Sequence, residues 1–252
     1  LTGPVSIKGE PWSYQHYVTL LTGEIDGAID FLYQPDMEWS VPESLRAKVN
    51  QQGELTPFFG DTTVFSLSDG EIKKVGALID TLQPTSLFAT PLDRQQLHMT
   101  LHDLNNSPRK EEVSTAMEST QLQTEKIMQQ LNLYLERHPE DRYINMVSTK
   151  AFDCLNIAVL LGFKPASERD YKILMNLYNL FEPVVYLDYW LRPHVTLTYF
   201  KPRVPTEDEV ALLRDSIERV NQHSVELKLD IMELAYQHFY DMNSYQTVAR
   251  PL

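Results

Sequence analysis

The sequence predicts one body of mixed helices and strands, built from two similar units and preceded by an N-terminal extension. Two observations support this. Strand-like and helix-like segments alternate along the 252 residues, and the order strand, helix, strand, helix, strand occurs twice. The two units span residues 59–150 and 151–252, so the whole body is 59–252, and residues 1–58 lie outside the repeat.

The first unit is expected to contain three strands and two helices. Residues 62–67 are rich in β-branched and aromatic side chains and predict a strand. Ser68 and Glu71 have the spacing of a capping box, and apolar residues at helical spacing follow through 71–82. The remaining elements are a strand at 97–104, a long helix at 111–137 and a strand at 143–149.

The second unit repeats this order. Residues 155–161 are strongly apolar and predict a buried strand, and Ser167 can cap a helix that Pro183 ends. The remaining elements are a strand at 194–200, a helix opened by a capping box at Thr206 and Glu209, a strand of alternating character at 225–231, and one or two strands between 234 and 248.

The N-terminal extension, residues 1–58, is expected to pack on the body through a helix around 26–32 and a proline-rich connection. Alternating strands and helices could also form a doubly wound parallel sheet. No glycine-rich phosphate loop follows any of the expected strands, so the nucleotide-binding version of that fold has no support.

Composition excludes several classes of protein. With 42% hydrophobic and 23% charged residues the chain is typical of soluble globular proteins, and its longest apolar run, 154–163, is too short to span a bilayer. A single cysteine excludes a disulfide framework or a cysteine-based zinc site. The formal net charge of −13 argues against a long nucleic-acid track, but leaves open a small anionic substrate in a locally basic cleft.

No signal peptide is recognisable, and we expect a cytoplasmic monomer with no membrane partner.

One four-residue pattern, His-x-Thr-Leu, occurs in the middle strand of both units. The copies are His98-Met99-Thr100-Leu101 and His194-Val195-Thr196-Leu197. By chance a chain of this composition would contain roughly 0.06 such patterns, so a pair on corresponding strands indicates a shared role.

The spacing of this pattern has a chemical consequence. Residues i and i+2 of a strand project from the same face, so His98 projects with Thr100, and His194 with Thr196. If the two units face each other, two imidazoles and two hydroxyls converge. One imidazole can take a proton from the attacking oxygen of a phosphodiester while the other protonates the leaving oxygen. The hydroxyls can bind the non-bridging oxygens.

The paired motifs resemble those of the two-histidine (2H) phosphoesterase superfamily, which has a LigT-like fold and carries one H-x-T/S-x motif on each of two pseudo-symmetric lobes. The second copy with its preceding residues, Arg192 to Leu197 (RPHVTL), is very similar to the family's R-P-H-x-T-L form. The resemblance covers about 59–252. Residues 57–62 (PFFGDT) also resemble the start of the first strand in one less studied branch.

This resemblance implies an α+β, bilobal fold in which two antiparallel sheets form a groove with helices outside. It also implies metal-independent phosphodiester chemistry, without a cofactor, on 2′,3′-cyclic phosphates or 2′-5′ linkages of a small nucleotide or short oligonucleotide, as in RNA processing. His98 and His194 would be the general acid and base, in either order, and Thr100 and Thr196 would bind phosphate. Hydrolysis and the reverse ligation both stay open.

Three further residues lie in or next to the motif strands. His102 is expected on the strand face of His98, where it would contact substrate, and Arg192 could attract a phosphate or be a solvated side chain. Tyr199, which stands where many relatives have arginine, is expected to point away from Thr196 if the strand is regular.

The sequence leaves open two alternatives to a metal-independent enzyme. One is a non-catalytic nucleotide-binding or protein-interaction module on the same scaffold. The other is a metal-dependent hydrolase that uses His98 and His102. No clear third ligand lies nearby in the sequence, so no metal site is predicted.

Overall fold

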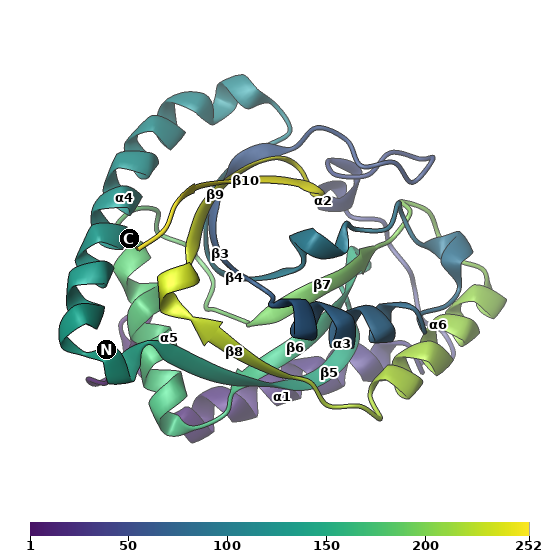
Figure 1. The fold of residues 1–252 in the computed structure, drawn as a ribbon. Coiled ribbons are helices and arrows are strands. Elements are labelled where there is room, and N and C mark those ends of the chain that lie inside the picture. Colours follow the sequence, from purple (N-terminus) through teal and green to yellow (C-terminus); the bar gives the residue numbers. More distant parts are fainter. Residues whose placement is uncertain (252) are drawn as a thin grey trace.

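A single curled sheet of eight strands organises the computed structural model, which describes residues 1–251 (Figure 1). The strand order is β10-β9-β3-β4-β7-β6-β5-β8, and every paired neighbour is antiparallel. A separate two-stranded sheet and six α-helices complete the described chain. The expected α+β class with antiparallel strands is confirmed, and the two expected sheets are joined edge to edge into one.

The elements of the body follow the expected order. They are β3 (Phe59–Ser66), α3 (Asp69–Ile79), β4 (His98–Ser107), α4 (Ser114–Arg137), β5 (Tyr143–Cys154), β6 (Ala158–Pro165), α5 (Glu168–Phe181), β7 (His194–Tyr199), α6 (Glu207–Val220), β8 (Glu226–Asp230), β9 (Ala235–Asp241) and β10 (Ser244–Ala249). The N-terminal extension contains β1 (Ser6–Ile7), β2 (Glu10–Pro11), α1 (Tyr14–Phe31) and α2 (Glu43–Arg46).

The two halves of the sheet do not coincide with the two sequence units. Strand β5 begins within the first unit but pairs with β6 and β8, and the C-terminal strands β9 and β10 extend the half that contains β3 and β4. The expected lobes 59–150 and 151–252 therefore exchange strands. The halves meet where β4 pairs with β7, through Met99 and Val195.

Capping residues determine where the helices begin. Both expected capping boxes form, Ser68 with Glu71 before α3 and Thr206 with Glu209 before α6. In each, the hydroxyl accepts from the third backbone N–H of the helix while the glutamate carboxylate accepts from the backbone N–H of the cap. Ser167 caps α5 as expected, because its side chain accepts from the backbone N–H of Asp170.

The turn between β5 and β6 corrects one expected boundary. The apolar run is expected to be a strand from residue 155, but β6 begins at Ala158. Leu155 and Asn156 have φ angles of 53° and 63°, so they form the left-handed turn of a β-hairpin, and Leu155 is 77% exposed. Hydrophobicity alone placed Leu155 in the strand, whereas hairpin closure puts it in the turn.

The N-terminal helix α1 is longer than the expected 26–32 and lies against β5 and β6 (Figure 1). Its residues Tyr17, Leu21 and Ile25 are buried. The hydroxyl of Tyr17 donates to the carbonyl of Leu191, 2.8 Å away, in the segment that leads into β7. The extension is thus bonded to the approach of one motif strand.

Among residues 1–251, no helix has both the length and the apolar character that a bilayer crossing requires.

The exposed Leu155 offers a test of the hairpin. A left-handed conformation costs a leucine about 1–2 kcal/mol and costs asparagine less, because the short amide side chain bonds locally. Leu155→Asn is expected to raise the free energy of unfolding by about 1 kcal/mol, measured by urea denaturation. Leu133→Asn, at an exposed position of α4, is the control and is expected to lower it slightly. Destabilisation by Leu155→Asn would contradict the assigned turn.

Candidate active site

The two His-x-Thr-Leu motifs lie side by side at the centre of the sheet, at the beginning of β4 and of β7. Their second residues, Met99 and Val195, are partners in the antiparallel pairing. Continuing this register by one residue in each direction sets each histidine opposite the threonine of the other motif, on one face of the sheet. His98 and Thr196 indeed border the same small hollow. We call this side of the sheet the motif face.

Both imidazoles are held in the same way. Nδ1 of His98 lies 2.7 Å from the carbonyl oxygen of Gln96, and Nδ1 of His194 lies 2.8 Å from the carbonyl oxygen of Arg192. Because a carbonyl only accepts, each Nδ1 carries the hydrogen. Each Nε2 then keeps its lone pair, as a nitrogen that exchanges a proton with substrate requires.

Both histidines favour the neutral form. Burial lowers the pKa of His98 and of His194, and this is the largest effect at each. The positive charge of His194 lowers the pKa of His98 further, as expected for two imidazoles that are close together. The carboxylate of Asp103 acts in the opposite direction on both.

Each motif ends in a β-bulge. On β4, Thr100 and His102 face consecutive residues of β3, so Leu101 is an extra residue. On β7, Thr196 and Thr198 face consecutive residues of β6, so Leu197 is extra. The fourth residue of both motifs is therefore the bulged one. A bulge shifts the strand's alternation by one residue and redirects every side chain that follows.

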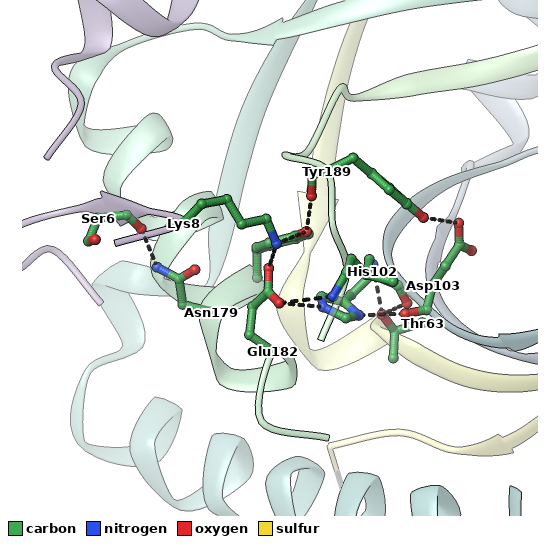
Figure 2. A network of polar contacts seen from close by, with 10 residues as sticks. Ser6, Lys8, Thr63, His102, Asp103, Asn179, Glu182 and Tyr189 are labelled. Atoms are coloured by element: carbon green, nitrogen blue, oxygen red, sulfur yellow. Dashed lines mark hydrogen bonds and ion pairs between the residues drawn. The ribbon is translucent and has the colours of Figure 1, made fainter. Parts of the chain in front are cut away.

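The bulge on β4 turns His102 away from the strand face of His98, where it was expected. Its side chain is fully buried behind the sheet, with the ring centroid 4.7 Å from that of Tyr178 and 6.3 Å from that of Phe181 on α5. Its Nε2 lies 3.8 Å from Glu182 (Figure 2). His102 therefore does not share the face of His98, and it is placed neither to contact a substrate there nor to share a metal ion with His98.

His102 instead supports the bulge. Its Nδ1 lies 2.6 Å from the carbonyl oxygen of Asp103, and its backbone N–H and carbonyl both bond to the hydroxyl of Thr63 on β3 (Figure 2). The corresponding residue of the second motif behaves alike, because the hydroxyl of Thr198 donates to the carbonyl of Tyr199.

The second consequence is that Asp103 and Tyr199, each five residues after a motif histidine, turn to the motif face. Tyr199 borders the hollow of His98 and Thr196, so the expectation that it points away is wrong. That expectation assumes a regular strand, and the bulge makes the strand irregular. Burial raises the pKa of Tyr199, so its hydroxyl stays protonated.

Asp103 is fixed by two donors. The hydroxyl of Thr62 lies 3.1 Å from one carboxylate oxygen. The hydroxyl of Tyr189 lies 3.2 Å from the other (Figure 2). Asp103 projects from the same face as Thr100, and its negative charge raises the pKa of both motif histidines. The sequence patterns assign Asp103 no role, because they do not reveal the bulge that turns it to the motif face.

Arg192 is positioned differently from the expectation of a phosphate-binding arginine. Its guanidinium forms a two-pronged ion pair with Glu24 of α1, at 2.5 and 3.0 Å, and lies 4.1 Å from the ring of Trp190. Its charge is therefore already compensated. It still borders, with His194, the pocket that adjoins this motif.

Lys48 is a cation near the motifs that sequence reasoning missed. It follows α2 in the extension, and its ammonium lies 5.2 Å from the ring of Phe58 and 5.9 Å from that of Tyr199. Burial lowers its pKa, Asp103 raises it, and its charge in turn lowers the pKa of His194. No ion pair of Lys48 occurs among residues 1–251.

Throughout the described part of the chain, no three His, Cys, Asp or Glu side chains are grouped so that they could hold a metal ion.

Solved structures with a similar fold have low sequence identity to this chain. ATU0111 of Agrobacterium tumefaciens, a conserved protein of unknown function, has a TM-score of 0.62 and 17% identity over 89% of this chain and 98% of its own. This likeness shows that the chain shares the fold of that protein. LigT of E. coli, solved with ATP, matches with a TM-score of 0.45 and 12% identity over 77% of this chain and 97% of its own. TT0787 of Thermus thermophilus matches with a TM-score of 0.45 and 14% identity over 77% of this chain and 96% of its own. No family model and no curated protein matches the chain.

The charge of Asp103 predicts a pH effect. Burial holds the pKa of both histidines below 6.5. Asp103→Asn removes a charge that raises both pKa values, so the titration profile of each imidazole, followed by NMR of the ring, is expected to move to lower pH. Glu111→Gln, at an exposed position that does not belong to the motifs, is the control. An unchanged profile in Asp103→Asn would contradict the proximity of this carboxylate to the histidines.

Proposed function

We propose that this protein is a phosphodiesterase in which His98 and His194 act as general acid and base. The observation that carries the proposal is the matched presentation of the two imidazoles. Each Nδ1 is bonded to the carbonyl two residues earlier, and neither Nε2 has a hydrogen-bond partner among residues 1–251. The two histidines lie on adjacent strands and on one face of the sheet. Two histidines with unrelated structural roles would have no reason to share this geometry.

The chemistry follows from this arrangement. A phosphodiester bound between the motifs accepts hydrogen bonds at its non-bridging oxygens from the hydroxyls of Thr100 and Thr196. Nε2 of one histidine takes a proton from water as its oxygen attacks phosphorus. Nε2 of the other histidine, protonated, gives its proton to the leaving ester oxygen as the P–O bond breaks. The anionic phosphate favours one charged imidazole, and so offsets the effect of burial on the pKa.

Lys48 supplies the positive charge in this proposal. Among residues 1–251 it is the cation close to the motifs that lacks a carboxylate partner, whereas Arg192 is bound to Glu24. An ammonium that is partly desolvated and unpaired stabilises a phosphate more strongly than one in water. The extension would thereby complete a site whose other members come from the two motifs.

The substrate class we propose is a small nucleotide phosphodiester, a 2′,3′-cyclic phosphate or a 2′-5′ linkage. The resemblance of the motifs to those of the 2H phosphoesterases supports this class. The overall charge of −13 supports a small substrate, because a long polyanion would require many cationic contacts.

Removal of either imidazole tests the proposal. His98→Ala and His194→Ala are each expected to lower kcat on a 2′,3′-cyclic mononucleotide by about 10²–10³-fold, since each removes an acid or a base. His223→Ala, at an exposed position outside the site, is expected to keep normal activity. Circular dichroism checks that the variants fold.

The same assay separates the alternatives. Nucleotide binding without turnover by the unaltered protein would favour a non-catalytic module. Activity that is lost in chelator and restored by one metal ion would favour a metal-dependent hydrolase. Near-normal turnover by folded His98→Ala would contradict the acid–base pair.

Lys48 is tested by a charge-removing variant. Lys48→Gln is expected to raise KM for the cyclic mononucleotide by about 10–100-fold, as loss of a charged hydrogen bond does, and Lys48→Arg is expected to restore part of the affinity. Lys73→Gln, on the exposed side of α3, is the control. An unchanged KM in Lys48→Gln would remove Lys48 from the phosphate site and leave the role of the histidines intact.

A further inference from the structure

A pocket of about 440 Å³ adjoins His194 on the motif face. Gly162 and Leu160 of β6 lie opposite His194 and Thr196 of β7, so all four project from the same face of the sheet. A Cβ added at Gly162 would meet Cδ1 of Ile25 of α1 at 2.9 Å. Helix α1 therefore lies over the motif face beside His194, and the pocket lies between this helix and the strands.

The wall of the pocket is mostly apolar. Leu21, Ile25 and Ala28 of α1 form one side, and Phe152 and Leu160 of β5 and β6 form the other. The volume is within the roughly 300–1,000 Å³ typical of pockets that bind small molecules.

The charged groups at this pocket do not favour a second phosphate. The Arg192 guanidinium is bound by both carboxylate oxygens of Glu24. The other carboxyl in the wall, that of Asp153, has its pKa raised to about 7 by burial. Among the described residues that line the pocket there is no unpaired cation, so a phosphate placed there would be desolvated without compensation.

We propose that this pocket holds an uncharged ring carried by one ester arm of the substrate, while the phosphodiester itself lies at the histidines. The substrate would then be a phosphodiester with a nucleobase or aryl ring on the His194 side and no further phosphate on that arm. This inference rests on the proposed function, because it places the phosphorus between the two motifs. The N-terminal extension gains a role in substrate selection, since α1 supplies one side of the wall.

The experiment measures binding and needs no turnover. Dissociation constants of phenyl phosphate, inorganic phosphate and pyrophosphate are measured by calorimetry. Phenyl phosphate is expected to bind about 10–100-fold more tightly than inorganic phosphate, because burying a ring of this size contributes about 1.5–3 kcal/mol. Pyrophosphate is expected to gain nothing over inorganic phosphate.

Variants of α1 locate the ring. Ala28→Leu and Ala28→Phe fill the pocket progressively and are expected to reduce the preference for phenyl phosphate in that order. Thr19→Phe adds the same bulk at an exposed position of the same helix and is expected to keep it. Thermal unfolding checks each variant, and Ala28→Leu serves if Ala28→Phe does not fold.

The outcomes separate the two proposals. Equal affinity for phenyl phosphate and inorganic phosphate, a preference for pyrophosphate, or an undiminished ring preference in folded Ala28→Leu and Ala28→Phe would each overturn the pocket assignment. The activities of the histidine variants bear only on the catalytic assignment. Either proposal can therefore fail while the other stands.

Discussion

The pairing of β4 with β7 is the contact on which the site depends. It joins the two halves of the sheet through Met99 and Val195 and sets each motif histidine across from the other motif's threonine. Each half alone presents one imidazole and one hydroxyl. A one-residue slip in this pairing would move one motif's pair to the other face of the sheet, so the register that holds the sheet together also assembles the chemistry.

The bulges that follow the motifs extend this design. Each inserts a leucine, Leu101 or Leu197, and so brings Asp103 and Tyr199 to the motif face while turning His102 to the back. The side chains around the histidines are therefore set by backbone geometry as much as by residue type. Burial of the whole cluster keeps both imidazoles mostly neutral, and the Asp103 carboxylate limits that effect.

Local patterns predicted much of this molecule, and contacts distant in sequence were missed. The capping boxes, most strand positions and the shared face of His98 and Thr100 follow from spacings of two to four residues. A bulge adds one residue without a recognisable local signature here, so the facing of His102 and Tyr199 was predicted wrongly. Lys48 lies about 50 residues before the first motif, and only tertiary packing brings it near Tyr199. The strand exchange between the units likewise depends on long-range pairing.

¹⁵N NMR of the imidazoles shows whether His98 and His194 present free Nε2 atoms to one shared phosphate. The structure predicts that His98 and His194, assigned by single substitution, are Nδ1–H tautomers that titrate below pH 6.5. Inorganic phosphate is predicted to raise the pKa of both. Nε2–H tautomers, or a response to phosphate at one histidine alone, would contradict the paired site.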